Sequence, residues 1–298
     1  MMTNLRRRKL FSGLFEILCG LAVVVALIPL VMILFYVIKE GFGALNLDFF
    51  IRMPKPVGES GGGMANAIVG TLILIGIAAL FAVPIGCLCG IHLAEYPGTK
   101  FSSVVRFAAD VLNGVPSIVV GIFAYGLLVL PVKRFSAIAG GVALGLLMIP
   151  IVVRTTEELL RLVPGGLREG ALALGATRSR AVFGVIVPAA LPGILTGILV
   201  ALARVAGETA PLLFTTLGNT GWTRYLHYTI LGKAHTVGVV EYNQPTAALP
   251  LQIYAYATSA YPDLNRQAWA GALVLIILIV SSIAAVRYAV RHGTFGAS

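Results

Sequence analysis

Charged side chains are scarce in this sequence. Asp, Glu, Lys and Arg make up 11% of its 298 residues and hydrophobic residues 58%, whereas soluble domains average about 25% charged and about 45 to 50% apolar residues. The mean hydropathy is +0.93. A composition this poor in charge excludes an ordinary soluble domain and indicates an integral membrane protein.

Cysteine is scarce too. Cys19, Cys87 and Cys89 are the only three, they lie inside apolar runs, and they show no C-x-x-C spacing. An odd number of cysteines without a partner motif predicts neither a disulfide framework nor a metal site. We therefore expect this chain to bind no metal.

A nucleotide-binding motif is missing as well. The sequence contains no G-x-x-x-x-G-K-[ST] loop and no H-E-x-x-H, and its four histidines are scattered. The chain therefore lacks the usual phosphate-binding loop for hydrolysing ATP. We do not expect it to be an enzyme or to bind a cofactor of its own.

Long apolar runs dominate what is present. They cover residues 17–38, 64–91, 104–130, 138–153, 189–217 and 268–286. Most supply the roughly 20 residues that a helix needs to cross a bilayer, and the fourth is at the short limit. The sequence thus predicts an all-α polytopic membrane protein, in which residues 1–298 form one transmembrane domain with six membrane-spanning helices.

The distribution of lysine and arginine indicates the orientation. Six spans place both termini on one side, and more of the 22 Lys and Arg residues fall on that side than on the other. By the positive-inside rule both termini are cytoplasmic, and the net charge of +10 then needs no nucleic acid as a partner. The first run is too long for a signal peptide and lacks a cleavage site, so a retained helix is expected.

Two long loops and three glycine patterns add detail. The cytoplasmic loop 154–188 is basic and helix-patterned, whereas the outer loop 218–267 is rich in Tyr, Thr, Asn and Pro. One long loop on each side suggests one partner on each side. The G-x-x-x-G patterns at 86–90, 141–145 and 193–197 permit close helix contacts, within this chain or with a partner.

The cytoplasmic loop is predicted to contain short helices. Thr155 and Glu158 have capping-box spacing and predict a helix that starts after the fourth span. Pro164 and the two glycines after it break that helix. A second helix is predicted from Leu167 to near Gly175. From periodicity alone, this helix is either a rigid knob at the cytoplasmic surface or an interfacial helix lying on anionic lipid.

The second helix carries a resemblance. Glu169, Ala171, Gly175 and the closing pair Val187-Pro188 resemble the EAA loop of ABC importer permeases, although Gly170 stands where the second residue is usually Ala and Val187 where Leu is usual. The resemblance implies that this helix enters a cleft of a cytoplasmic ATPase and transmits its opening and closing. The residues implied in ATPase coupling are Arg168, Glu169, Gly170, Ala171, Leu172 and Gly175.

Longer segments resemble one branch of that family. VRTTEE at 153–158 and ARVAGETAPLLFT at 203–215, with further segments between residues 66 and 254, look like permeases of phosphate-specific ABC importers. The resemblance implies a type I ABC importer permease fold in a prokaryotic cytoplasmic (inner) membrane, and a phosphate substrate. It also implies three kinds of partner: a cytoplasmic ABC ATPase dimer that uses ATP, a second homologous permease subunit and an outer phosphate-binding protein.

Charges inside the apolar runs are the clearest functional signal from the residues themselves. Arg204 lies near the centre of the fifth run, and Glu208 follows one turn later on the same helix face. An arginine at mid-span costs about 2.5 to 3.5 kcal/mol. Either the two residues form an ion pair that holds helices together, or Arg204 faces a pathway and accepts phosphate oxygens while Glu208 moderates the positive field. Thr209 is a weaker candidate for a hydroxyl contact.

A second charged pair repeats this spacing. Arg106 and Asp110 lie at the start of the third run, near the cytoplasmic interface. A structural pair that snorkels to the interface is favoured there, and both residues stay among the pathway candidates.

Other functions stay open on the residues alone. Arg204 would suit sulfate or molybdate as well as phosphate. A membrane-embedded enzyme such as a lipid-phosphate hydrolase would need a nucleophile and base at a suitable spacing, and none is evident. A non-transporting scaffold would use the loops alone.

Overall fold

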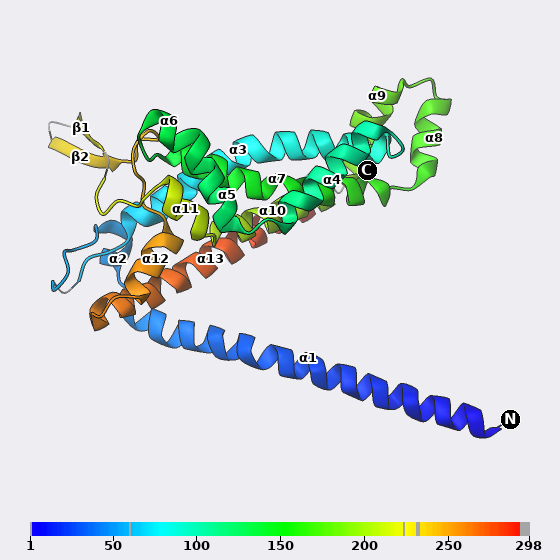
Figure 1. Ribbon diagram of the computed structural model, residues 1–298, viewed down its shortest axis with the longest axis horizontal. Helices are drawn as coiled ribbons and strands as arrows, with labels where there is room; N and C mark the ends of the chain where they lie inside the picture. The colour runs from blue at the N-terminus through cyan, green and yellow to red at the C-terminus, as the bar shows by residue number, and fades with distance from the viewer. Residues whose placement is uncertain (1, 60, 223, 231–232, 293–298) are drawn as a thin grey trace.

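The protein is a bundle of long helices. The computed structural model describes residues 2–59, 61–222, 224–230 and 233–292. Most helices lie side by side, while α1 (Met2–Ala44) diverges from the bundle and meets it near its own C-terminal end (Figure 1). Five helices are long and apolar enough to cross a membrane, and a bent pair makes a sixth, within the described residues. The predicted all-α polytopic class is confirmed.

The remaining elements follow in chain order. They are α2 (Leu47–Ile51), α3 (Ala65–Glu95), α4 (Lys100–Gly114), α5 (Ser117–Ala124), the π-helix η1 (Tyr125–Val129), α6 (Leu130–Val132), α7 (Ala137–Arg161), α8 (Gly165–Ala173), α9 (Arg178–Ala181), the π-helix η2 (Val182–Ile186), α10 (Val187–Ala206), α11 (Ala210–Thr215), β1 (Arg224–Ile230), β2 (Lys233–Val239), α12 (Leu249–Ala257) and α13 (Pro262–His292).

Helix α7 is the centre of the bundle. It packs most extensively against α3, and also against α10, α4 and α11. Leu144, Met148 and Val152 are at most 2% exposed, and they belong to a core that also contains Leu74 of α3 and Val205 of α10. More of the apolar window of α7 is buried than that of any other candidate span among the described residues. The residues of α7 before Arg154 are all apolar, and such an uncharged stretch is suited to this central place.

All three G-x-x-x-G patterns are used at helix contacts within the chain. On α3, a Cβ at Gly86 or Gly90 would meet Val152 or Thr156 of α7. Glycines 141 and 145 of α7 face α3 in the same way, and glycines 193 and 197 of α10 face α7. The missing side chains let the helix backbones approach closely, which is the role that such patterns have in membrane helices.

This packing gives a first prediction. A Cβ at position 90 would lie 2.6 Å from the Cβ of Thr156 and 2.8 Å from the carbonyl oxygen of Val153. We expect Gly90→Val to lower the free energy of unfolding by about 1 to 3 kcal/mol through overpacking. Thermal unfolding of the purified chain measures it. The matched control is Gly76→Val on the same helix, where a Cβ would meet nothing within 4 Å. Equal losses in the two variants would contradict the packing explanation.

The third apolar run does not form one straight helix. The α4 helix and the segment from Ser117 to Val132 meet at an angle of 105°. Val115 is the C-cap of α4 and has an extended backbone, because the residue before a proline disfavours helical geometry. Pro116 then stands as the N-cap of α5. The predicted run 104–130 therefore forms a bent pair of helices and not one straight helix.

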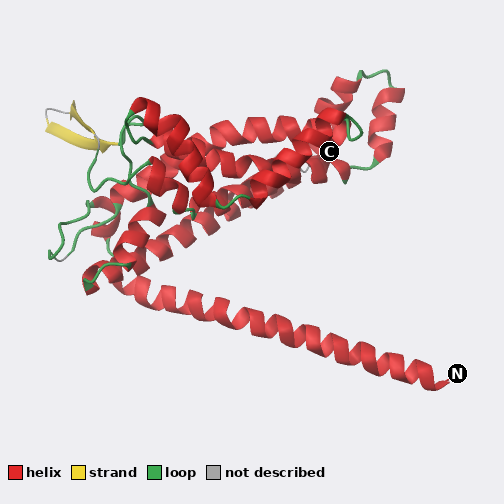
Figure 2. Cartoon of the chain, in the orientation of Figure 1, coloured by secondary structure: helices red, strands yellow, loops and turns green. Residues whose placement is uncertain are grey.

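The loop 218–267 is more ordered than the sequence suggests. Strands β1 and β2 form an antiparallel hairpin in which Arg224 pairs with Val239 and Ile230 with Lys233. The hairpin projects from one end of the bundle, whereas α8 and α9 lie at the opposite end (Figures 1 and 2). Helix α12 follows the hairpin, and the backbone N–H of Leu249 donates to the buried hydroxyl of Thr71 at 2.7 Å. Tyr, Thr, Ile and Val in these two segments favour strands, a signal that the composition of the whole loop concealed.

Candidate functional site

Arg204 and Glu208 do not lie on one helix. The α10 helix ends at Ala206, and the backbone N–H of Gly207 is bonded to the carbonyl oxygens of Arg204 and Val205. A new helix, α11, begins at Ala210. The expected one-turn spacing on a common face is therefore wrong, and so is the expectation that Arg204 sits near the middle of a continuous span.

Two residues explain this break. Gly207 has a low helix propensity. Pro211, four residues later, has no N–H to donate to the carbonyl of Gly207, and its ring would clash with that carbonyl in a continuous helix. The sequence signal was therefore present in the G-E-T-A-P spacing.

Arg204 has no side-chain partner within the described part of the chain. Its side chain is exposed, and no ion pair joins it to the half-exposed Glu208 or to any other described carboxylate. It lies in the last turn of α10, where the partial negative charge of the helix terminus favours a cation. Thr209 is the N-cap residue of α11, but its side chain makes no capping bond. The three residues thus form a polar break between two apolar helices, with a free guanidinium.

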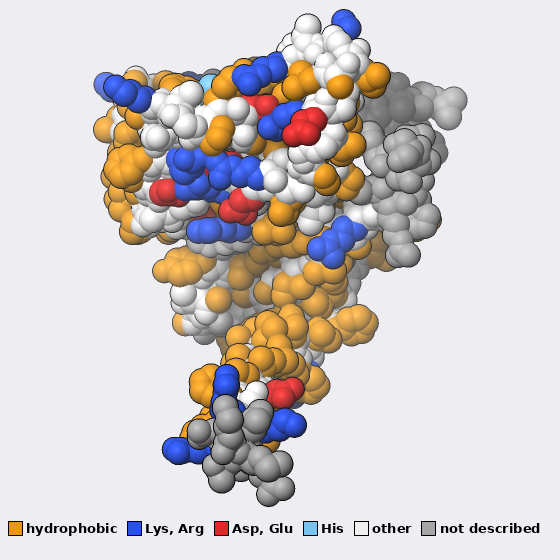
Figure 3. All heavy atoms as spheres, turned by 90° about the vertical axis from the view of Figure 1, so that its right-hand side faces the viewer, with side chains coloured by type: hydrophobic (Ala, Val, Ile, Leu, Met, Phe, Trp, Pro, Cys, Tyr) orange, Lys and Arg blue, Asp and Glu red, His pale blue; other side chains and the backbone are white. Residues whose placement is uncertain are grey.

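A cluster of charges lies at the α8 and α9 end of the bundle. Its centre is Glu157 of α7, whose side chain is 2% exposed. Its Oε1 accepts hydrogen bonds from Nε and Nη2 of Arg106 at 3.2 and 2.6 Å, and Nη2 of Arg161 is 2.8 Å from the same atom. Its Oε2 accepts from Nη1 of Arg154 at 3.2 Å. Figure 3 shows basic and acidic side chains gathered on this end of the molecule.

Arg106 and Asp110 belong to this cluster but do not pair with each other. Arg106 bonds to Glu157, and the carboxylate of Asp110 accepts from Arg154. Both bonds join α4 to α7. Sequence analysis missed the two α7 residues, although the i, i+3 spacing of Arg154 and Glu157 was visible.

Arg154 and Glu157 were missed because α7 is longer than the predicted span, which ended at residue 153. The helix continues to Arg161 without a break. The hydroxyl of Thr155 donates to the carbonyl oxygen of Ile151 at 2.9 Å, as is usual for a threonine inside a helix. Thr155 is therefore not an N-cap, and the expected new helix at the start of the 154–188 loop is wrong.

The α8 helix stands out from the bundle. None of its residues is buried, and Leu174 just beyond it is 91% exposed. The helix ends as predicted at Gly175, which has φ +83°. The N–H of Gly175 bonds to the carbonyl of Leu172 at 3.0 Å and that of Ala176 to Ala171 at 3.1 Å, which is a Schellman motif that requires the left-handed backbone at Gly175.

One ion pair connects α8 to the bundle. Nη2 of Arg168 lies 2.5 Å from Oε1 of Glu95 at the C-terminal end of α3. Glu169, the next residue, is exposed. Helix α8 thus presents most of its surface outward while Arg168 connects it to the helix that packs along α7.

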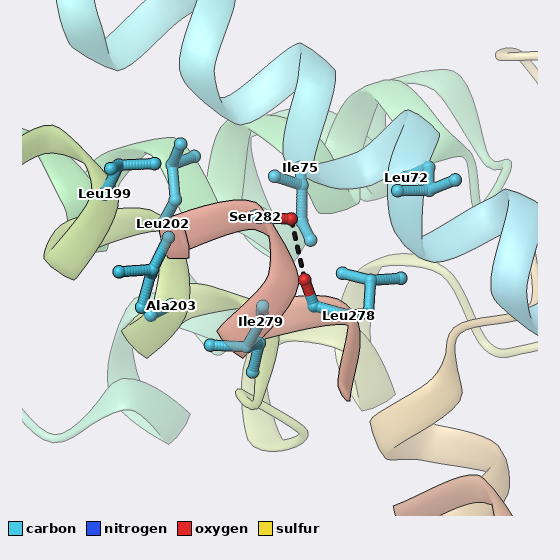
Figure 4. A pocket seen from close by; sticks show the side chains of 10 residues that line it. Leu72, Ile75, Leu199, Leu202, Ala203, Leu278, Ile279 and Ser282 are labelled. Atoms are coloured by element: carbon cyan, nitrogen blue, oxygen red, sulfur yellow. Dashed lines mark hydrogen bonds between the residues drawn. The ribbon is translucent and has the colours of Figure 1, made fainter. Parts of the chain in front are cut away.

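A deep apolar cleft between α3, α10 and α13 carries no charge. It has a volume of about 90 Å³ and is lined by residues such as Leu72, Leu202 and Ile279 (Figure 4). Its Ser282 hydroxyl donates to the carbonyl oxygen of Leu278 at 2.7 Å. This cleft is unsuited to an anion.

Within the described ranges, no three His, Cys, Asp or Glu side chains come together as a metal-binding group.

These features define a class of protein. A bundle of long apolar helices with a short exposed helix at one end is the architecture of a polytopic helical membrane protein. The chain is similar in fold to the permease in two inward-facing structures of the MetNI methionine ABC transporter. The TM-scores are 0.55 and 0.56 at 19% identity, covering 76% and 77% of this chain and 93% of each of those chains.

Sequence comparison gives the family. Residues 82–292 match the family described as binding-protein-dependent transport system inner membrane component, and the chain belongs to it. Curated relatives named phosphate transport system permease protein PstA include one from Haemophilus influenzae, 41% identical over 92% of this chain and 91% of that protein. One from Yersinia pestis is 43% identical over 87% and 84%. PstA 1 of Mycobacterium tuberculosis is 39% identical over 87% and 81%.

Proposed function

We propose that this chain is the membrane-spanning permease subunit of an ATP-driven importer of inorganic phosphate. The observation that carries the proposal is the 41% identity to a phosphate transport system permease over almost the whole chain. The lone guanidinium of Arg204 supports it independently. A planar fork with two parallel donors suits two oxygens of one phosphate, and it keeps its charge.

The two ends of the bundle are assigned to opposite sides of the membrane. We place α8 and α9 in the cytoplasm, together with both termini, and Figure 1 draws the start of α1 and the end of α13 toward that end of the protein. The exposed α8 helix docks on a dimer of ATPase subunits that use ATP, through the coupling residues Arg168, Glu169, Gly170, Ala171, Leu172 and Gly175. The hairpin and α12 lie outside, where a phosphate-binding protein delivers its ligand. A second homologous permease subunit completes the pathway.

Arg204 is assigned a transient contact with phosphate. In the apolar surroundings of α10 its charge attracts a dianion strongly. Glu208, which lies beyond the break and is half exposed, moderates this field, so that the anion is released as well as bound. The break between α10 and α11 gives both side chains freedom to approach the passing anion or each other. Thr209 offers a hydroxyl beside them.

Reconstitution tests the proposed function. We expect the chain, assembled with its ATPase, second permease and binding protein in vesicles, to accumulate radiolabelled phosphate only when ATP is supplied. An excess of unlabelled phosphate should abolish the signal, whereas sulfate and molybdate should not. If sulfate or molybdate suppressed the accumulation as strongly as unlabelled phosphate does, the importer would not be specific for phosphate. ATP hydrolysis without any accumulation would favour a scaffold.

A further inference from the structure

A polar cavity lies between the bundle and α8. It has a volume of about 260 Å³ and is formed by the end of α3, the end of α7, the start of α8 and η2. Its lining residues are Ala94, Leu160, Arg161, Val163, Pro164, Gly165, Arg168 and Ile186. The two arginines are the only charged side chains in the lining. The cavity is separate from Arg204, which does not line it.

Both arginines have unused hydrogen-bond donors. Arg168 contacts Glu95 through Nη2, while its Nε is buried and has no partner in the described part of the chain. Nη2 of Arg161 lies 2.8 Å from Oε1 of Glu157, and the Arg161 side chain is 47% exposed. A guanidinium carries five N–H donors. Leaving a buried donor without an acceptor costs about 1 to 3 kcal/mol, so Nε of Arg168 favours an acceptor nearby.

The start of α8 adds to this donor set. Gly165 is the first residue of the helix and lines the cavity, and the N-cap residue Pro164 has no side chain that caps the helix. The N–H groups of a first helical turn are open to an anion. The nearby carboxylates are Glu95 and Glu157, each of which is already paired with one of the two guanidiniums. No carboxylate lines the cavity itself.

We propose that this cavity binds a phosphate-type oxyanion between Arg161 and Arg168. Two guanidiniums and a helix start provide the donors that a phosphate group accepts. Such an anion would join the end of α7 to the start of α8 and so set how firmly α8 is held to the bundle. Free inorganic phosphate and the phosphate of a phospholipid headgroup share this chemistry, and the experiment separates them.

The test uses the assembled transporter carrying Arg204→Ala, which removes the contact assigned to transport. It is placed in nanodiscs of phosphatidylcholine without ATP, and equilibrium binding of radiolabelled inorganic phosphate is measured. We expect binding that the double change Arg161→Gln, Arg168→Gln weakens about tenfold or more, because each guanidinium donates charge-assisted bonds. Phosphate held by the ATPase subunits is the same in both samples and drops out of the comparison.

Glu95→Gln is the matched control. It removes the ion pair between α3 and α8 but leaves both arginines, so anion binding should persist or tighten. Equal loss in Glu95→Gln and in the double variant would assign the effect to the ion pair and overturn the site. Assembly of each variant is checked by co-purification of all subunits in the same ratio as in the starting complex, because Arg168 lies on the helix that is proposed to dock on the ATPase.

A second arm distinguishes the source of the anion. The same proteins are extracted from membranes containing phosphatidylglycerol, and the retained anionic lipid is quantified by mass spectrometry. Phosphate binding in phosphatidylcholine that depends on the two arginines identifies free phosphate. Retained lipid that the double variant loses, with no such phosphate binding, identifies a headgroup. The absence of both overturns the proposal, whatever the result of the uptake assay.

Discussion

Replacing Arg204 by alanine should abolish most phosphate uptake while the transporter still assembles and hydrolyses ATP. The guanidinium is exposed and has no partner among the described residues, so its removal breaks no ion pair in the fold. Hydrogen bonds to a charged group are worth about 1.5 to 3 kcal/mol. Their loss should reduce uptake roughly ten- to hundredfold at limiting phosphate. Uptake into vesicles and ATP hydrolysis are measured on the same preparation.

Two further variants test the reason for that loss. Arg204→Lys keeps the charge but not the planar fork, so it should restore uptake only in part. Arg287→Ala removes another exposed arginine, in α13, and should leave uptake within twofold of the starting protein, because about 0.5 kcal/mol is the usual effect of a surface change. Normal uptake by Arg204→Ala would show that phosphate crosses elsewhere.

The overall fold was readable from the sequence because lipid imposes strict rules. Long apolar runs that cross a bilayer form helices, because a helix satisfies all of its backbone hydrogen bonds within the segment. The ends and breaks of these helices were harder to predict from the sequence. Pro116 and Pro211 were visible, yet a proline in a membrane helix produces anything from a mild kink to a full break, and neighbouring helices decide which. The hairpin in the outer loop was missed because only the short segments Arg224–Ile230 and Lys233–Val239 are rich in strand-forming residues, whereas the loop as a whole is polar.

The residues of the candidate site also differ in how far the local sequence predicts their structure. Gly175 requires a left-handed backbone, which glycine alone adopts without strain, so the end of α8 could be predicted locally. The Glu157 cluster could not, because Arg106 and Glu157 are 51 residues apart and meet only through the packing of α4 on α7. Arg204 was prominent in the sequence, but its separation from Glu208 depends on whether one helix continues through Gly207.

The second large effect is expected at Glu157. Its carboxylate is almost fully buried and contacts Arg106, Arg154 and Arg161, of which the first two are about one quarter exposed. Glu157→Gln keeps the shape but leaves three guanidiniums facing one another around a neutral amide. Removing one partner of a buried ion pair costs about 3 to 5 kcal/mol. We expect a loss of that size in the free energy of unfolding.

Asp110→Asn is the control that tests whether the destabilisation at Glu157 results from the burial of its carboxylate. Asp110 belongs to the same cluster, but its side chain is 55% exposed. When Asp110 is neutralised, Arg154 still forms an ion pair with Glu157. Exposed ion pairs contribute about 0 to 1 kcal/mol, so this variant should unfold close to the starting protein. Thermal and denaturant unfolding of the purified chain compare the two. If Asp110→Asn destabilises as much as Glu157→Gln, the cluster acts through its total charge, and Glu157 is not the anchor between α4 and α7.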